Sequence, residues 1–342
     1  MLKLQKEKQH EQWVDYAKLF ACILVVLGHL FQSFAKTNLI DGSSVVYNTF
    51  QHVIYLFHVP VFFFCSGYLY QKISPINSWS NYKKNVWNKF LNLGIPYFTF
   101  SIITLVLKSF ASNSIVTPQE YSFLETLFLH PASPYWFLYT LFFIFVFIPS
   151  LNKKTISYIC SLVIILKIIS ILLSNKIALP FCISSLMSNA VWFVLGMVVM
   201  KFNALSKTNC AITLISLLFI PLSILLYANN IKSPWISIML TFLGITMTCL
   251  LFYKAKQIPK YLNVFLNYMS KYTMQIFLLH TICAASFRAL LFKFDIQSFY
   301  IHLCFGILIS FFLPIALAYI AEKSFYLDFF FRPVKVIKGK TK

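Results

Sequence analysis

Residues 17–34 read AKLFACILVVLGHLFQSF, an almost unbroken apolar run with one lysine and one histidine. A transmembrane helix needs about 20 mostly apolar residues, because the hydrocarbon core of a bilayer is about 30 Å thick. Further runs of similar length and composition follow along the chain. The sequence therefore predicts about ten transmembrane helices, at residues 17–34, 47–70, 90–110, 135–151, 156–174, 179–200, 211–227, 234–253, 272–292 and 299–321.

The composition is that of a membrane protein. Hydrophobic residues make up 59% of the 342 residues and charged residues only 11%, whereas a soluble domain has roughly 25% charged residues. The segments lack the alternation of apolar and polar residues that is typical of an outer-membrane barrel, so helices are left to satisfy the backbone in hydrocarbon. We predict an all-α, polytopic bundle that forms a single domain over residues 1–342, with short tails at about 1–12 and 332–342.

The positive charge follows the topology of the predicted helices. The net charge of +20 would suit a nucleic acid, but the lysines occur in short clusters between apolar runs, and we predict no nucleic-acid partner. Cytoplasmic loops of membrane proteins carry an excess of Lys and Arg. If the N-terminus is cytoplasmic, the external segments hold only Lys36, Lys176, Lys232 and Lys293. We therefore expect both termini in the cytoplasm, with basic inner loops facing anionic membrane lipids or an anionic cytosolic ligand.

The first predicted helix carries three ionisable residues on one face. Asp15 and Lys18 lie at its inner end, and His29 lies deep in the run. Lys18 and His29 are about 20° apart around the helix and about 16 Å apart along it. Ionisable side chains within a membrane helix are costly and by default mark a functional site. The alternative is that Lys18 snorkels to the interface and His29 bonds a neighbouring carbonyl.

More ionisable residues occupy the second and ninth predicted helices. They are His58, and His280 with Arg288 two turns further on. Histidine titrates near neutral pH, so three membrane histidines indicate either acid–base catalysis in a cavity or proton-coupled transport. Lys167, deep in another run, needs a partner such as a backbone carbonyl.

Small residues and cysteines are interpreted as packing features. Ser66 and Gly67 in the second predicted helix would allow close contact with a neighbouring helix, and a functional role would explain the pair about as well. The eight cysteines include no CxxC pair, and we predict neither a disulfide framework nor a metal site.

Five segments together resemble the membrane acyltransferase-3 family, and most closely its fucose 4-O-acetylase-like branch. They are WVDYAKLFACILVVLGHL (13–30), FHVPVFFFCSGYLY (57–70), LGIPYFTF (93–100), YWFLYTLF (135–142) and IFLLH (276–280). The first two are specific in combination, and the match extends in order over essentially the whole chain. The family's first-helix motif is a basic residue, ten intervening residues and a histidine, which Lys18 and His29 match. Where the family often has an arginine pair before the third helix, this chain has lysines.

The resemblance implies an integral membrane O-acyltransferase in the inner membrane of a bacterium. Acetyl would pass from cytosolic acetyl-CoA to a sugar hydroxyl of a surface polysaccharide or of its lipid-linked precursor. On this hypothesis His29 is the catalytic base. The expected supporting catalytic residues are Asp15, Lys18 and His58.

The expected binding residues divide between the two substrates. CoA is a polyanion and should bind basic residues at the inner face. The acceptor glycan should enter from outside, where aromatic rings can stack on its apolar face. The expected CoA contacts are Lys18, Lys84 and Lys89, and the expected acceptor contacts are Tyr135, Trp136, His280 and Arg288.

Two other functions are consistent with the sequence. A proton-coupled transporter or flippase for a lipid-linked glycan would use the histidines as a proton relay, although the chain shows no inverted repeat and no matching pair of broken helices. A non-enzymatic scaffold in a polysaccharide-assembly complex would explain the helices but not the histidines.

Overall fold

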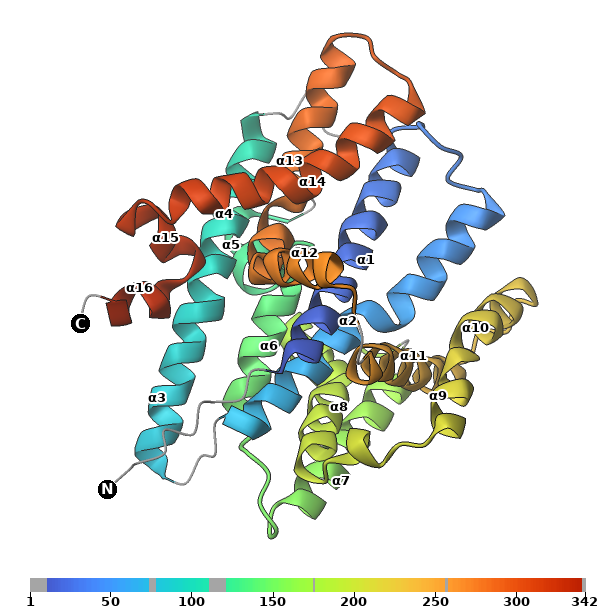
Figure 1. Ribbon diagram of the computed structural model, residues 1–342, viewed down its shortest axis with the longest axis vertical. Coiled ribbons are helices and arrows are strands. Elements are labelled where there is room, and N and C mark those ends of the chain that lie inside the picture. Colours follow the sequence, from blue (N-terminus) through green and yellow to red (C-terminus); the bar gives the residue numbers. More distant parts are fainter. Residues whose placement is uncertain (1–10, 74–77, 111–120, 175, 256–257, 340–342) are drawn as a thin grey trace.

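The computed structural model describes residues 11–73, 78–110, 121–174, 176–255 and 258–339. Most of the expected N-terminal tail lies outside these residues. Every regular element within them is a helix (Figure 1). In chain order the elements are α1 (Gln12–Lys36), α2 (Val45–Ile73), α3 (Trp79–Lys89), η1 (Phe90–Gly94), α4 (Ile95–Phe110), α5 (Phe123–Phe128), α6 (Trp136–Phe147), α7 (Ile156–Leu173), α8 (Phe181–Lys201), η3 (Ala204–Lys207), α9 (Cys210–Leu217), α10 (Phe219–Ala228), α11 (Pro234–Lys254), α12 (Lys260–Lys271), α13 (Thr273–Lys293), α14 (Phe299–Ala321), α15 (Phe325–Phe331) and α16 (Pro333–Gly339).

Within the described residues, nine helical segments are long and apolar enough to cross a membrane. They are α1, α2, the continuous Trp79–Phe110 segment, α7, α8, the Cys210–Ala228 segment, α11, α13 and α14. Each corresponds to one predicted span, so the all-α, polytopic membrane fold is confirmed. The remaining predicted span, 135–151, contains the shorter apolar helix α6.

The shortness of α6 has a structural cause. Ser133 and Pro134, just before the helix, are non-helical and line a cavity together with Trp136, the first residue of α6. The segment before α6 thus lies within the bundle although it is not helical. Irregular backbone is tolerated at membrane depth where it lines a cavity.

Two helix ends differ from the sequence prediction. The basic stretch before residue 90 was expected to be a loop, but α3 begins at Trp79, where the Ser78 side chain accepts a hydrogen bond from the Asn81 amide. Hydropathy alone predicts a start that is too late, because the first turns of this helix are polar. The N-cap serine is the sequence signal that marks the true start. The expected tail from residue 332 contains α16, and Arg332 before it pairs with Glu322 and Asp328.

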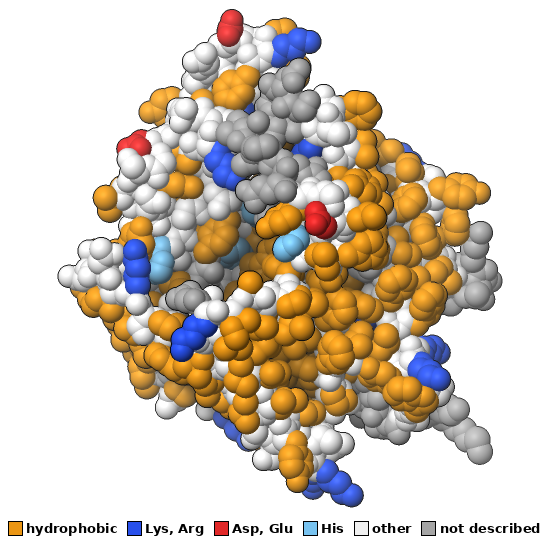
Figure 2. All heavy atoms as spheres, turned by 180° about the vertical axis from the view of Figure 1, so that it is seen from behind, with side chains coloured by type: hydrophobic (Ala, Val, Ile, Leu, Met, Phe, Trp, Pro, Cys, Tyr) orange, Lys and Arg blue, Asp and Glu red, His pale blue; other side chains and the backbone are white. Residues whose placement is uncertain are grey.

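Helices α1 and α2 lie side by side in the middle of the bundle (Figure 1). α13, α14 and α4 lie on one side of them, and α7, α8 and α11 lie on the other. Figure 2 shows hydrophobic side chains over much of one face, with Lys and Arg mostly toward its margins. This distribution suits a surface that is in contact with lipid.

The tightest helix contact joins α2 and α8 through two glycines. A Cβ atom added at Gly67 would lie 1.9 Å from the Phe193 carbonyl oxygen, and one added at Gly196 would lie 2.0 Å from the Phe64 carbonyl oxygen. The two backbones are therefore in direct contact. The expected role of Gly67 in close helix packing is confirmed.

Polar residues of α8 are satisfied by its other neighbours. The Lys167 amine donates to the Ser188 carbonyl oxygen at 3.0 Å, and a backbone carbonyl is the kind of partner that the sequence predicted for this half-buried cation. The Ser170 and Ser188 hydroxyls are 2.7 Å apart, and so are those of Thr140 and Ser185.

We expect Gly67→Ala to destabilise the protein strongly. The new methyl group would collide with backbone that cannot rotate away, and overpacking of this kind costs at least about 1–3 kcal/mol. Thermal unfolding of the purified protein in detergent measures the effect. Gly42→Ala is the control, because its methyl group would meet Ala35 Cβ at an ordinary 3.5 Å. Equal melting temperatures for the two variants would contradict the described α2–α8 contact.

Candidate active site

Three cavities lie along the face of α1 that carries its ionisable residues. "Inner" here denotes the end of the bundle where α1 begins, which is expected to be cytoplasmic, and "outer" denotes the opposite end. The inner pocket has a volume of about 440 Å³. The two outer pockets have volumes of about 620 and 430 Å³.

The inner pocket is basic and partly aromatic. Asp15 and Lys18 of α1 line it together with Lys89 at the end of α3 and Lys271 at the end of α12. The Lys89 amine also lies 3.9 Å from the centroid of the Phe145 ring. Three cations against one carboxylate give this pocket a net positive charge, which favours an anionic ligand.

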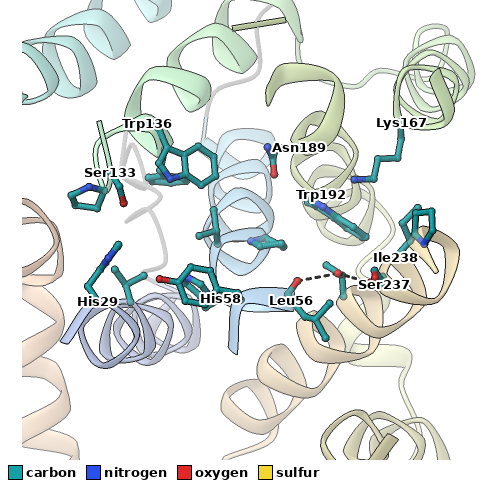
Figure 3. Close-up of a pocket in the computed structure, with 18 of the residues that line it drawn as sticks. His29, Leu56, His58, Ser133, Trp136, Lys167, Asn189, Trp192, Ser237 and Ile238 are labelled. Atoms are coloured by element: carbon teal, nitrogen blue, oxygen red, sulfur yellow. Dashed lines mark hydrogen bonds between the residues drawn. The ribbon is translucent and has the colours of Figure 1, made fainter. Parts of the chain in front are cut away.

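The larger outer pocket, called here the tryptophan pocket, combines polar groups with indole rings. Figure 3 shows His29 and His58 along one side, with Trp136 and Asn189 opposite them. Other lining residues are Ser133, Lys167, Trp192, Ser237 and Thr241. Aromatic rings next to amide and hydroxyl groups are features of a site for a neutral or weakly polar ligand such as a sugar.

The smaller outer pocket, called here the basic pocket, lies on the other side of His29. Its charged lining residues are Lys36, Lys108 and Arg288, and it is also lined by His130 and His280. His29 lines both outer pockets. The His29 side chain therefore lies between a cavity lined by tryptophans and a cavity lined by cations.

His280 supports His29 from α13. The two imidazole centroids are 5.5 Å apart. Nδ1 of His280 lies 2.8 Å from the Phe277 carbonyl oxygen and 3.1 Å from that of Ile276. A carbonyl oxygen can only accept, so Nδ1 of a neutral His280 carries the proton and Nε2 is left as an acceptor. This Nε2 is buried and has no hydrogen-bond partner among the described residues.

His58 is held in the same way from α2. Its Nδ1 lies 2.6 Å from the Ile54 carbonyl oxygen, so its Nε2 is also the accepting nitrogen when the ring is neutral. The backbone thus selects one tautomer for each histidine that accompanies His29 in an outer pocket.

Aromatic side chains separate the inner pocket from the tryptophan pocket. Phe137 and Phe277 line both cavities, and their ring centroids are 5.7 Å apart. Phe62 completes the group, with its centroid 5.4 Å from that of Phe137 and 6.1 Å from that of Phe277. We call these three residues the phenylalanine barrier.

Among the described residues, no group of three or more His, Cys, Asp or Glu side chains could hold a metal ion. The histidines of the outer pockets suit proton transfer, the lysines suit the binding of an anion, and the indole rings suit the binding of a ring-shaped ligand. Residues 11–319 match the family described as "Acyltransferase domain", the acyltransferase-3 family. The chain belongs to this family. No curated protein and no solved structure matches the chain significantly.

The structure of this acyltransferase brings together most of the residues that the sequence singled out. Asp15, Lys18 and Lys89 share the inner pocket. The predicted outer residues divide between the tryptophan pocket, with His58 and Trp136, and the basic pocket, with His280 and Arg288.

Two predicted binding residues are placed elsewhere. Lys84 is exposed on α3 and lines none of the three cavities. Tyr135 is fully buried, and its hydroxyl lies 3.0 Å from both the Leu278 carbonyl oxygen and the Thr104 hydroxyl. No face of its ring is open for stacking on a sugar, and it anchors the start of α6 against α4 and α13.

Sequence reasoning missed three cations that line the cavities. Lys271 comes from α12, which the helix count did not include because the helix is amphipathic rather than uniformly apolar. Lys36 was placed in an external segment, and Lys108 lies near the outer end of the helix predicted at 90–110. Their common position is visible only once α1 and α4 are both packed against α13.

We expect Tyr135→Phe to lower the melting temperature by a few degrees, because a buried hydrogen bond that is lost costs about 0.5–1.5 kcal/mol. Tyr139→Phe is the matched control: its hydroxyl donates to the Phe128 carbonyl oxygen at 2.7 Å in an exposed position. Thermal unfolding of both variants tests the assignment. A loss of stability in Tyr139→Phe that equals or exceeds the loss in Tyr135→Phe would count against it.

Proposed function

We propose that this acyltransferase moves an acyl group, acetyl in the first instance, from acyl-CoA in the inner pocket to a sugar hydroxyl in the outer pockets. The observation that carries the proposal is the position of His29, which lines both outer pockets on the same helix as the inner-pocket residue Lys18. The acceptor would be a surface polysaccharide or its lipid-linked precursor, as in the fucose 4-O-acetylase-like branch. The protein would reside in the cytoplasmic membrane of a bacterium.

The donor would bind with its charged part at the inner end. The lysines of the inner pocket would contact the phosphates of CoA, since charge-assisted hydrogen bonds to phosphate are strong. The narrow pantetheine arm would then extend between Phe137 and Phe277 toward His29. Because these rings lie between the two cavities, they would have to move aside for the thioester to reach the acceptor, and they would limit the passage of water.

His29 would act as general base. It accepts the proton of the acceptor hydroxyl while the hydroxyl oxygen attacks the thioester carbonyl carbon. A carbon–oxygen bond forms and the carbon–sulfur bond breaks. The thiolate of CoA leaves and takes the proton from His29, so the histidine is neutral again and the products are the ester and CoA.

His58 and His280 would orient neighbouring groups and would not stabilise the negative charge of the oxyanion. In the tautomers that the backbone selects, the free Nε2 of each ring accepts a hydrogen bond and cannot donate one to an oxyanion. Each can therefore orient the N–H of His29 or a non-reacting hydroxyl of the acceptor. Stabilisation of the oxyanion would need other donors, such as the Asn189 amide in the tryptophan pocket.

Replacing the proposed base tests the function directly. We expect His29→Ala to reduce acyl transfer by 10²–10⁴-fold, the range typical of general-base catalysis, with little change in melting temperature. The measurement is release of CoA thiol from acetyl-CoA together with O-acetyl groups on cell-envelope glycan added to the purified protein. His52→Ala is the control, because His52 stacks on Tyr227 and lines none of the three cavities. A wild-type rate of acyl transfer in the His29→Ala variant would rule out the proposal.

The two predicted CoA lysines of α3 provide a second test. Lys89→Met should raise the KM for acetyl-CoA roughly tenfold or more, because a charged hydrogen bond in a partly buried site contributes about 1.5–3 kcal/mol. Lys84→Met should leave it unchanged, since Lys84 lies outside the pocket. Equal KM values for these variants would place the donor elsewhere.

A further inference from the structure

The basic pocket gathers three cations that take no part in the proposed reaction steps, and of these only Arg288 was an expected acceptor contact. Lys36 ends α1, Lys108 lies in α4 and Arg288 lies in α13, yet all three line one cavity. None of its described lining residues is Asp or Glu. Within the described part of the chain, these cations make no hydrogen bond or ion pair; the recorded ion pairs involve Lys72 and Arg332.

Buried polar atoms of the same pocket also lack partners. His280 and Ser310 are each 1% exposed, and both line the pocket. His280 Nε2 and Ser310 Oγ are buried without a hydrogen-bond partner among the described residues. A buried polar group without a partner costs about 1–3 kcal/mol, so these atoms indicate a polar ligand in the cavity. Nε2 of neutral His280 can only accept and would meet a hydroxyl of that ligand, whereas the Ser310 hydroxyl can donate to an anion.

Topology does not account for the cations. Basic residues at the outer end of a membrane protein oppose the positive-inside rule. In this chain they are scarce at the expected outer end, yet Lys36, Lys108 and Arg288 converge there on one cavity. Like charges placed together repel each other, and an anion bound between them would remove this repulsion.

We propose that the acceptor is an anionic glycan, whose phosphate or carboxylate group binds in the basic pocket while its reacting hydroxyl lies at His29. This inference rests on the proposed acyl transfer. It follows from the position of His29, which lines both the basic pocket and the tryptophan pocket. The CoA phosphates are assigned to the inner pocket instead, because that pocket has its own lysines and lies beyond the phenylalanine barrier.

The test measures anion binding separately from acyl transfer. The purified protein, in neutral detergent and saturated with CoA so that the inner pocket is filled, is titrated at constant ionic strength with four probes. These are α-D-glucose 1-phosphate, D-glucuronate, uncharged methyl α-D-glucoside and phosphatidylglycerol. The readout is the shift in melting temperature, from which an apparent Kd is derived. The variants are Lys36→Gln, Lys108→Gln and Arg288→Gln, with Lys293→Gln, an exposed cation five residues after Arg288, as the control.

We expect one or both anionic sugars to stabilise the wild type, methyl glucoside to stabilise it much less, and each pocket variant to raise the apparent Kd of the anionic sugar at least about tenfold. Lys293→Gln should behave as wild type, and the shift produced by CoA should persist in all variants. Stabilisation by glucose 1-phosphate alone identifies phosphate, and stabilisation by glucuronate alone identifies carboxylate.

The proposal is overturned if methyl glucoside binds as well as the anionic sugars, if the pocket variants bind them as wild type does, or if phosphatidylglycerol is the only stabilising probe. Failure of acyl transfer is a separate result. Anion binding that depends on Arg288, in a protein that transfers no acyl group, would leave the anion site in place and remove the proposed reaction.

Discussion

Polar and charged side chains within a bilayer are costly, by at least about 2.5–3.5 kcal/mol for a charge at the centre of a helix, and this constraint explains how the interior of the protein is arranged. Such a side chain needs a protein partner or a cavity. Lys167 has both, since it donates to the Ser188 carbonyl oxygen and also lines the tryptophan pocket. His58 and His280 satisfy one nitrogen at a backbone carbonyl. The remaining polar groups are accommodated in the cavities beside α1, because exposing them to lipid would be costly.

The same constraint explains which parts of the fold could be predicted. Long apolar runs leave the backbone no choice but helix, so each of the nine long spans corresponds to a predicted run. Hydropathy carries less information where a segment is polar or lines a cavity. The start of α3 at Trp79, the short α6 and the amphipathic α12 all belong to these cases.

Residues of the candidate site were predictable when one helix carries them. Lys18 and His29 share a face of α1, and helical periodicity alone is enough to relate them. Residues on different helices were harder to assign. Lys84 and Lys89 both belong to α3, but Lys89 lines the inner pocket and Lys84 is exposed. Tyr135 directly precedes Trp136, but Tyr135 is buried against other helices, whereas Trp136 lines the tryptophan pocket. These distinctions depend on helix packing, which sequence composition does not specify.

The arrangement gives a physical account of transfer across a membrane. Donor and acceptor would approach His29 from opposite ends of the bundle, with the phenylalanine barrier between the inner pocket and the tryptophan pocket. The thioester would then pass through an apolar constriction, while both hydrophilic substrates remain in polar cavities. Specificity for the acceptor would come from the outer pockets, and affinity for the donor from the inner lysines.

Cryo-electron microscopy of the protein with bound CoA would show whether the donor approaches His29 from the inner end of the bundle. We expect the CoA phosphates to contact Lys18, Lys89 and Lys271, and the pantetheine arm to pass between Phe137 and Phe277 so that its sulfur points toward His29. CoA bound in the basic pocket, or held on the surface with its sulfur away from His29, would exclude this path for the donor.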